Sequence, residues 1–285
     1  MDLGLRDRAY LVTGGSRGLG FAAARALVAD GARVLLSAPS ESTAAAAVAR
    51  LAQDHGPGAA AWAIADNADP ATPDQLIAAA RDRFGRLDGA LISVGGSPGG
   101  TVADTGDDAW RSAFESVFLG AVRLARILAA ELDGRDLDGT DLNSTDLNGG
   151  DDGRAGTGSL TGTGGSIVFV LASSVRVPLA ELAISNGLFP GLAGVVKTLA
   201  SELGPAGIRI NGLLPVRIAT DRVRELDALL GDPDEVRARL SERIPLRRYG
   251  EPEEFGRTAA FVLSPAASYI TGAMIPIDGG AISSI

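Results

Sequence analysis

Short apolar runs alternate along this chain with segments whose apolar residues recur at helical spacing. The apolar runs predict strands at 10–13, 33–37, 59–64, 87–93, 166–171, 208–214 and 273–277. The helical patterns predict helices at 21–29, 41–53, from Thr72 onward, and at 107–132, 191–203, 221–230, 233–243 and 252–263. This alternation predicts an α/β protein: a Rossmann-type, doubly wound parallel sheet of about seven strands with helices on both faces. The length of 285 residues fits one domain, and the 46% apolar content is enough to bury both faces of the sheet.

The segment 134–165 interrupts the alternation. It is rich in Gly, Asp and Thr, and the sequences DLDGT, DLNST and DLNGG follow one another with Leu137, Leu142 and Leu147 in register. The composition favours a disordered acidic insertion. A pentapeptide-repeat β-helix is an alternative, with too few copies to bury a core, and so is a Ca²⁺ site, although the Asp spacing does not give an EF-hand loop. Because the segment joins a helix end to a strand start, we expect it at the sheet edge opposite the ligand crevice.

Charge and composition exclude several classes of function. The net charge of −9 argues against nucleic acid as a partner. With no cysteine and one histidine, neither a disulfide framework nor a conventional zinc site is expected, so we predict no metal. The first residues show no basic and apolar leader, and no apolar run approaches the length of a membrane span. The expectation is a cytoplasmic protein without membrane contact.

A glycine motif, TGGSRGLG at 13–20, lies between the first predicted strand and the first predicted helix. In this context Gly14 permits a tight turn, Gly18 lets the backbone approach a pyrophosphate, and Gly20 lets the helix pack on the sheet. The helix N-terminus offers N–H groups and a positive dipole end to phosphates. The alternative is a purely structural glycine turn. We predict a dinucleotide site formed by Gly14, Ser16, Arg17, Gly18, Leu19 and Gly20.

The end of the second predicted strand bears on the choice of cofactor. NAD-preferring sites place a carboxylate there to hold the ribose hydroxyls. Here residues 37–40 are SAPS, and the first acid is Glu41. A 2′-phosphate would meet no repulsion, Ser37 and Ser40 can donate hydrogen bonds to it, and Arg17 can pair with it unless Arg17 is only a solvated loop cation. NADP(H) is therefore predicted over NAD(H).

The TGxxxGxG spacing, together with YITG at 269–272 and DGG at 278–280, resembles the short-chain dehydrogenase/reductase family. The resemblance covers nearly the whole chain outside 134–165. It implies oxidoreduction of a small-molecule substrate with a nicotinamide cofactor, and a homodimer or homotetramer. It also implies an adenine contact at Asp66 and a nicotinamide contact at Thr220. The loop after the fourth strand, usually NNAG, is here Ser93-Val94-Gly95-Gly96, which places further cofactor contacts at Ser93 and Gly95.

The family's proton-transfer residues are replaced. In the family a Ser orients the carbonyl, a Tyr transfers the proton, a Lys four residues later lowers the tyrosine pKa, and an Asn on the central helix completes a relay. Ser174 matches the serine, whereas Ile184 and Leu188 occupy the Tyr and Lys positions and Val117 the Asn position. No tyrosine lies between Tyr10 and Tyr249. Lys197, nine residues past Leu188, is about 14 Å further along a helix.

These features leave three hypotheses open. The first is an atypical NADP(H)-dependent oxidoreductase acting on a small carbonyl or hydroxyl compound, with water or the substrate delivering the proton. The second is a catalytically inactive subunit that binds cofactor or a partner, and the third is a non-redox lyase, isomerase or cyclase on the same scaffold. The segment 216–250 is predicted to be a substrate lid. The polar groups expected near the crevice are Ser174, Ser185, Asn186, Ser93 and the acid Glu181.

Overall fold

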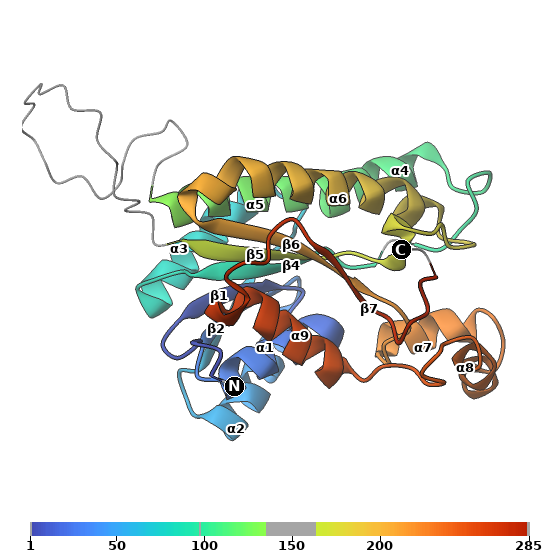
Figure 1. Cartoon of the computed structure of the whole chain (residues 1–285), viewed down its shortest axis with the longest axis horizontal. Coiled ribbons are helices and arrows are strands. Elements are labelled where there is room, and N and C mark those ends of the chain that lie inside the picture. The colour runs from blue at the N-terminus through green and yellow to red at the C-terminus, as the bar shows by residue number, and fades with distance from the viewer. Residues whose placement is uncertain (1, 97, 135–163, 284–285) are drawn as a thin grey trace, which may run out of the picture.

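A parallel sheet organises the molecule (Figure 1). The computed structural model describes residues 2–96, 98–134 and 164–283, and within them seven strands pair in the order β3-β2-β1-β4-β5-β6-β7. The order reverses between β1 and β4, so the carboxyl ends of these two strands form the topological switch point of a doubly wound fold. This confirms the predicted fold class. The strands are β1 (Ala9–Thr13), β2 (Arg33–Ala38), β3 (Ala60–Ile64), β4 (Gly89–Ser93), β5 (Gly165–Val170), β6 (Ile208–Pro215) and β7 (Met274–Ile277).

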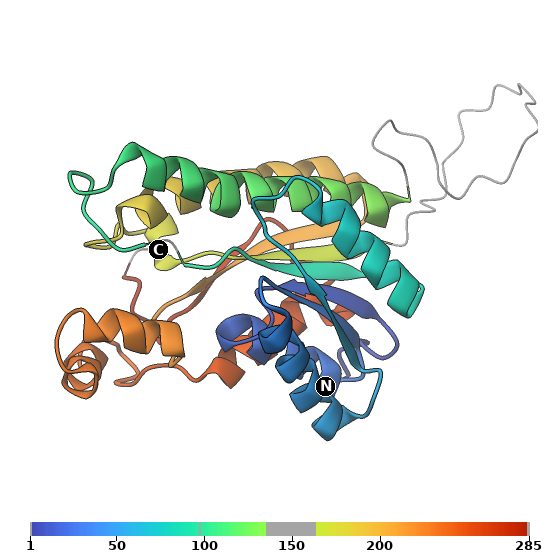
Figure 2. The same cartoon turned by 180° about the vertical axis from the view of Figure 1, so that it is seen from behind.

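Helices cover both faces of the sheet (Figures 1 and 2). One face carries α1 (Gly18–Ala29), α2 (Glu41–His55) and α9 (Pro252–Leu263), and the other carries α3 (Thr72–Phe84), α5 (Gly120–Asp133) and α6 (Ala183–Leu203). Successive side chains of a strand point to opposite faces. In β5, Ile167 and Phe169 therefore join the core under α5 and α6, whereas Val168 joins the core under α1 and α9.

The predicted helix 107–132 is continuous but not uniform. It consists of α4 (Asp107–Ala113), a π-helical segment (Phe114–Leu119) and α5. Such π-helical segments are rare inside α-helices and often occur at functional sites. After this segment the helix approaches the loop that follows β3, since a Cβ on Gly120 would lie 2.1 Å from the carbonyl oxygen of Asn67.

Helix α6 begins at Ala183, so the prediction that it begins at Gly191 was wrong. Proline inside a helix and nearby glycines normally indicate a break, and Pro190 follows Gly187 closely. The early turns form nevertheless, because Ile184, Leu188 and Leu192 are buried in one core cluster with the central helix. Tertiary packing thus outweighs the local signal.

The segment predicted to be a lid forms a separate excursion after β6. It contains α7 (Asp221–Ala228) and α8 (Pro233–Ser241), which lie beyond the carboxyl ends of the strands (Figure 1). Its stem is closed by backbone pairing between Ile218 and Gly250. Residues 135–163, which include nearly all of the acidic insertion predicted at 134–165, lie outside the described residues. Within the described part of the chain, no helix combines the length and the apolar character needed to cross a membrane.

Candidate cofactor and active site

The glycine loop has the backbone geometry that the sequence predicts. Gly14 has φ 60° and Gly18 has φ 55°, both in the left-handed region that favours glycine. A Cβ on Gly20 would lie 2.4 Å from the Gly14 carbonyl oxygen, so only glycine lets α1 start so close to the turn. Arg17 is the N-cap residue, and no described side chain caps this end of the helix. The first turn therefore presents open N–H groups, a cradle that fits a phosphate.

A buried threonine fixes this loop at the switch point. The Thr13 hydroxyl accepts a hydrogen bond from the Ser93 backbone N–H (2.8 Å) and donates one to the Ser93 carbonyl oxygen (2.9 Å). The carboxyl ends of β1 and β4 are thereby joined. Ser93 Oγ lies 3.4 Å from the position that a Cβ on Gly14 would take, and Gly95 is exposed with φ 77°. The structure thus brings the predicted residues Gly14, Ser93 and Gly95 to one edge of the sheet.

Residues of the segment 216–250, the predicted lid, reach the same place. Thr220 Cγ2 lies 3.7 Å from the position of a Cβ on Gly18, although the two residues are far apart in sequence. The Thr220 hydroxyl accepts a hydrogen bond from the Val223 N–H (3.3 Å) and so caps α7. The predicted nicotinamide contact therefore lies beside the glycine loop.

The remaining predicted cofactor residues occupy the side of β2 and β3. The N–H of Gly15 donates to the Ser37 carbonyl oxygen (3.1 Å), which ties the end of β2 to the glycine loop. Ser37 is buried, whereas Ser40 is half-buried as the N-cap residue of α2, and its hydroxyl lies 3.0 Å from that of Ser42. Asp66 is exposed and accepts a hydrogen bond from the Ala68 N–H (2.9 Å). Within the glycine loop, Arg17 is exposed, and Ser16 and Leu19 are half-buried.

The three positions that the sequence analysis matched to the family's proton-transfer groups are buried and apolar. Ile184, Leu188 and Val117 are 1%, 8% and 5% exposed and belong to one core cluster. Ser174 lies in a 3₁₀ turn after β5, is buried, and donates a weak hydrogen bond to the Ser185 carbonyl oxygen (3.4 Å). Neither a phenol nor an ammonium group is available at these positions.

The other polar groups expected here have structural partners. The Asn186 side chain accepts a hydrogen bond from the Leu179 N–H (2.9 Å) and donates one to the Leu179 carbonyl oxygen (2.7 Å). Asn186 thus holds the loop before α6 instead of offering its amide to a substrate. Glu181 is exposed, has φ 57°, and its carbonyl oxygen accepts from the Gly100 N–H (2.7 Å). Ser185 is buried.

Two glycines of α6 admit aromatic rings from the central helix. A Cβ on Gly187 would lie 2.9 Å from the Trp110 ring, and one on Gly191 would lie 2.8 Å from the Phe118 ring. These contacts place α6 tightly against the central helix. Gly187 and Gly191 are four residues apart, which places them on one face of a helix. This spacing was the sequence signal that could have predicted the packing.

The base of the lid contains a buried charged cluster that the sequence analysis missed. Asp227 is 2% exposed; its carboxylate accepts a hydrogen bond from Tyr249 (3.0 Å) and forms an ion pair with Arg217 (2.5 Å). Burial raises the pKa of Tyr249 to about 12. The guanidinium of Arg237 lies over the tyrosine ring at 5.3 Å, beside a cavity of about 130 Å³ between α7 and α8. These residues come from α7, α8 and the segments before and after them, so no local sequence pattern predicts the cluster.

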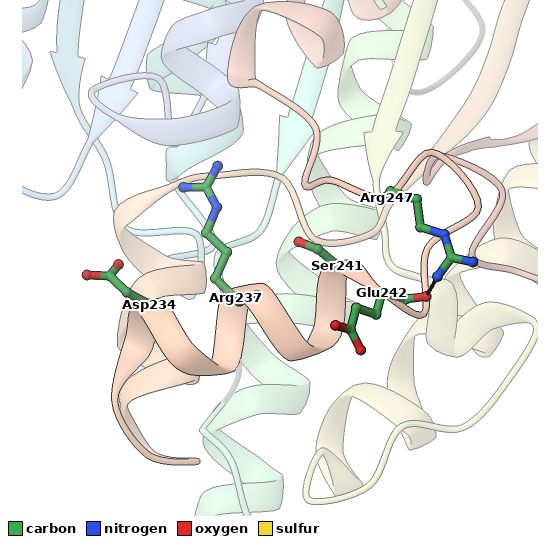
Figure 3. Close-up of a pocket in the computed structure, with 6 residues that line it drawn as sticks. Asp234, Arg237, Ser241, Glu242 and Arg247 are labelled. Carbon is green, nitrogen blue, oxygen red and sulfur yellow. Dashed lines mark hydrogen bonds between the residues drawn. The ribbon is translucent and has the colours of Figure 1, made fainter.

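A larger hollow lies on α8 (Figure 3). Its volume is about 420 Å³, and a hydrogen bond from Arg247 to the Glu242 carbonyl oxygen borders it. Arg237 and Asp234 point in different directions, and the charges of the lining are mixed. The hollow therefore presents no converging set of groups for one ligand. Among the described residues, no three His, Asp or Glu side chains form a group with metal-ligand geometry.

A parallel sheet whose switch point carries a glycine loop opening a helix is the arrangement of dinucleotide-binding α/β proteins. Residues 8–140 match the family model described as short chain dehydrogenase, and residues 154–281 match the model described as enoyl-(acyl carrier protein) reductase. The chain belongs to the short-chain dehydrogenase/reductase family, which is a family of oxidoreductases.

Individual relatives agree with this assignment over the full length. An L-rhamnose 1-dehydrogenase (NAD(P)(+)) of Azotobacter vinelandii is 31% identical and aligns over 97% of each chain. A 3-oxoacyl-[acyl-carrier-protein] reductase of Synechocystis is also 31% identical, with 98% of each chain covered. The L-sorbose reductase of Gluconobacter frateurii, solved with NADPH and L-sorbose, superposes with a TM-score of 0.84 at 26% identity over all of both chains.

Proposed function

We propose that this protein is an atypical NADP(H)-dependent oxidoreductase of small carbonyl or hydroxyl compounds. The observation that carries the proposal is the glycine cradle at the switch point, where Gly14 and Gly18 adopt left-handed backbone and Gly20 brings the open end of α1 against the turn. Ser93 and Thr220 flank the cradle on its two sides. The L-sorbose reductase solved with NADPH and the NAD(P)(+) L-rhamnose 1-dehydrogenase, both similar to this chain, support a nicotinamide cofactor.

The preference for the 2′-phosphate rests on the end of β2. Ala38 is the last residue of this strand, and no acid precedes Glu41. Ser40 at the start of α2 and the exposed Arg17 supply a hydroxyl and a cation near a phosphate placed there. NADP(H) is thus favoured over NAD(H), because nothing at this strand end repels the additional negative charge.

The reaction would use the chain's residues differently from the rest of the family. When bound, the cofactor supplies or accepts a hydride, which reduces a carbonyl to an alcohol once a proton reaches the oxygen. Ser174 would orient the carbonyl group of the substrate. Ile184, Leu188 and Val117 belong to the apolar core beside it. None of these three side chains can donate a proton, so water or a group of the substrate has to deliver it.

A second candidate is a catalytically inactive subunit that retains the cofactor. The specific observation in its favour is the burial of Ile184 and Leu188 in the core, which puts aliphatic side chains at the two positions matched to the proton-transfer pair. The two candidates agree on nucleotide binding and differ on turnover.

Calorimetry and a reductase screen separate them. The full chain is titrated with NADPH and NADH, and NADPH oxidation is followed over sugars, diketones and 3-oxoacyl thioesters. We expect NADPH to bind more tightly than NADH and at least one carbonyl compound to be turned over. Binding without turnover of any compound selects the inactive subunit. Failure of both nucleotides to bind at millimolar concentration refutes the oxidoreductase proposal.

We also propose that copies of the chain associate through the central helix. Phe114 is 44% exposed and stacks on Phe118, with ring centroids 5.2 Å apart and planes 10° from parallel. Phe118 is half-buried, so the exposed aromatic surface is that of Phe114, and exposed aromatic side chains are typical of association surfaces. Light scattering should give a dimer or tetramer, and Phe114→Asp should shift it toward the monomer; a wild-type monomer contradicts the proposal.

A further inference from the structure

The first turn of α7 touches both loops of the cofactor crevice. Thr220 lies against Gly18 of the glycine loop, as described above. Two residues later, Arg222 Nε lies 3.0 Å, and its Cζ 3.6 Å, from the position of a Cβ on Gly96, in the loop after β4. Any side chain at Gly96 would therefore displace the guanidinium. Because β1 and β4 are neighbours, this turn bridges the switch point itself.

The Arg222 side chain is partly exposed to solvent. Its ion pair with Glu225 (3.3 Å) is on the same helix, and the two side chains are 42% and 53% exposed. Exposed pairs of this kind contribute little and are readily exchanged for a better anion. On the opposite wall, Leu188 replaces the family's lysine, and Lys197 is exposed with its Nζ 3.5 Å from the Cβ position of Gly272. The lid thus provides a cation to a crevice that has lost one from α6.

We propose that Arg222 binds the diphosphate of the nicotinamide cofactor and draws the first turn of α7 over it. The inference rests on the proposed function, since it assumes that the glycine cradle holds a dinucleotide. The diphosphate is the ligand group expected at Gly18, which Thr220 already touches, whereas a 2′-phosphate would lie at the end of β2, beside Ser40. A planar guanidinium can bind two phosphate oxygens at once, which an ammonium group cannot match.

The chain offers a matched control on the same helix. Arg224 is also cationic, but it pairs with Asp234 of α8, the second helix of the segment (2.9 Å). Arg222→Met and Arg224→Met therefore remove the same charge from two faces of α7. Both variants are titrated by calorimetry with NADPH and with adenosine 2′-monophosphate, a probe that keeps the adenine and the 2′-phosphate but lacks the diphosphate.

We expect Arg222→Met to weaken NADPH binding roughly tenfold or more, the effect of losing a charge-assisted contact. Its affinity for adenosine 2′-monophosphate should be unchanged, and Arg224→Met should bind both ligands like the wild type. Equal NADPH affinity in Arg222→Met and wild type overturns the inference while leaving the proposed function intact. Parallel loss of both ligands in Arg222→Met also overturns it, because it indicates a distorted site instead of a missing phosphate contact. If the wild type itself binds no NADPH, the proposed function fails first.

Discussion

The Tyr249 hydroxyl donates a 3.0 Å hydrogen bond to Asp227 Oδ2, which joins the end of the lid segment to the last turn of α7. The other carboxylate oxygen of Asp227 pairs with Arg217, at the start of the same segment. Arg217 adopts φ 50°, an uncommon conformation for a non-glycine residue, which this pairing helps to hold. One buried carboxylate therefore connects the beginning, the middle and the end of the lid.

Removing the tyrosine hydroxyl should destabilise the lid. Tyr249→Phe leaves a buried carboxylate oxygen of Asp227 without its donor, which we expect to lower the free energy of unfolding by about 1–3 kcal/mol. Urea denaturation measures this loss, and limited proteolysis within 217–250 should become faster. Tyr269→Phe is the control, because Tyr269 is fully exposed. Equal stability of the two variants would contradict the role of the hydrogen bond.

Stability should fall in strong base. Burial raises the pKa of both Tyr10 and Tyr249 to about 12, from the ordinary value of 10.0. Between these values the unfolded chain has lost phenolic protons that the folded chain retains, so the free energy of unfolding falls as pH rises from about 10 to about 12. Near-ultraviolet absorbance should show two phenols ionising late. A Tyr10→Phe/Tyr249→Phe variant should lose most of this pH dependence, and an unchanged slope would contradict the assignment.

The glycine cradle can be tested with a pair of alanine substitutions. Gly20→Ala places a methyl group 2.4 Å from the Gly14 carbonyl oxygen and should abolish NADPH binding in calorimetry. Gly194→Ala meets open space in the interior of α6 and should stabilise the chain by about 0.5–1 kcal/mol without changing nucleotide affinity. Normal NADPH binding by Gly20→Ala would show that the cradle is not the nucleotide site.

Restoring the family's tyrosine and lysine should not restore its chemistry. Ile184→Tyr with Leu188→Lys introduces a phenol and an ammonium group into positions that are 1% and 8% exposed. Burying an unpaired ammonium is costly, so we expect a loss of several kcal/mol in the free energy of unfolding and a lysine with a lowered pKa. Val117 also remains at the position of the family's Asn, in the same core cluster as the pair. Rapid NADPH oxidation by the double variant would show that the rest of the site is intact.

A carboxylate at the end of β2 should reverse the cofactor preference. Ala38→Asp brings a negative charge to the strand end where an NADP 2′-phosphate is expected, and it supplies the acceptor that an NAD ribose needs. NADPH affinity should fall relative to NADH by roughly tenfold or more. Ala38→Asn, of the same size but neutral, should change the ratio much less. Unaltered selectivity in Ala38→Asp would place the 2′-phosphate elsewhere.

Local chemistry explains which parts of this molecule the sequence predicts well. Gly14, Gly18 and Gly20 are identified by spacing because the turn needs left-handed backbone and close approach at those positions. The strand and helix alternation is similarly local, and it gives the sheet order once the doubly wound topology is assumed. The start of α6 escaped prediction because Pro190 gives a strong local signal that buried neighbours such as Leu188 override.

The unpredicted parts of the site depend on contacts between distant segments. Arg222 meets Gly96, and Asp227 meets Tyr249, only because the lid folds back over β4 and onto its own stem. From sequence alone, an arginine on a polar helix that contacts another loop cannot be distinguished from one that is only solvated. The same holds for Asn186, whose amide was expected to face the crevice and instead holds the backbone of Leu179.

Backbone pairing of Ile218 with Gly250 means that the segment between them leaves the body of the domain and rejoins it at one point. Because of this stem, the residues between its two ends can become longer, shorter or different in sequence without a change in the position of β6 or of the start of α9. Exchanging residues 219–249 for the equivalent stretch of a relative would therefore leave the sheet and its glycine turn in place, while the surface presented at the crevice mouth changes.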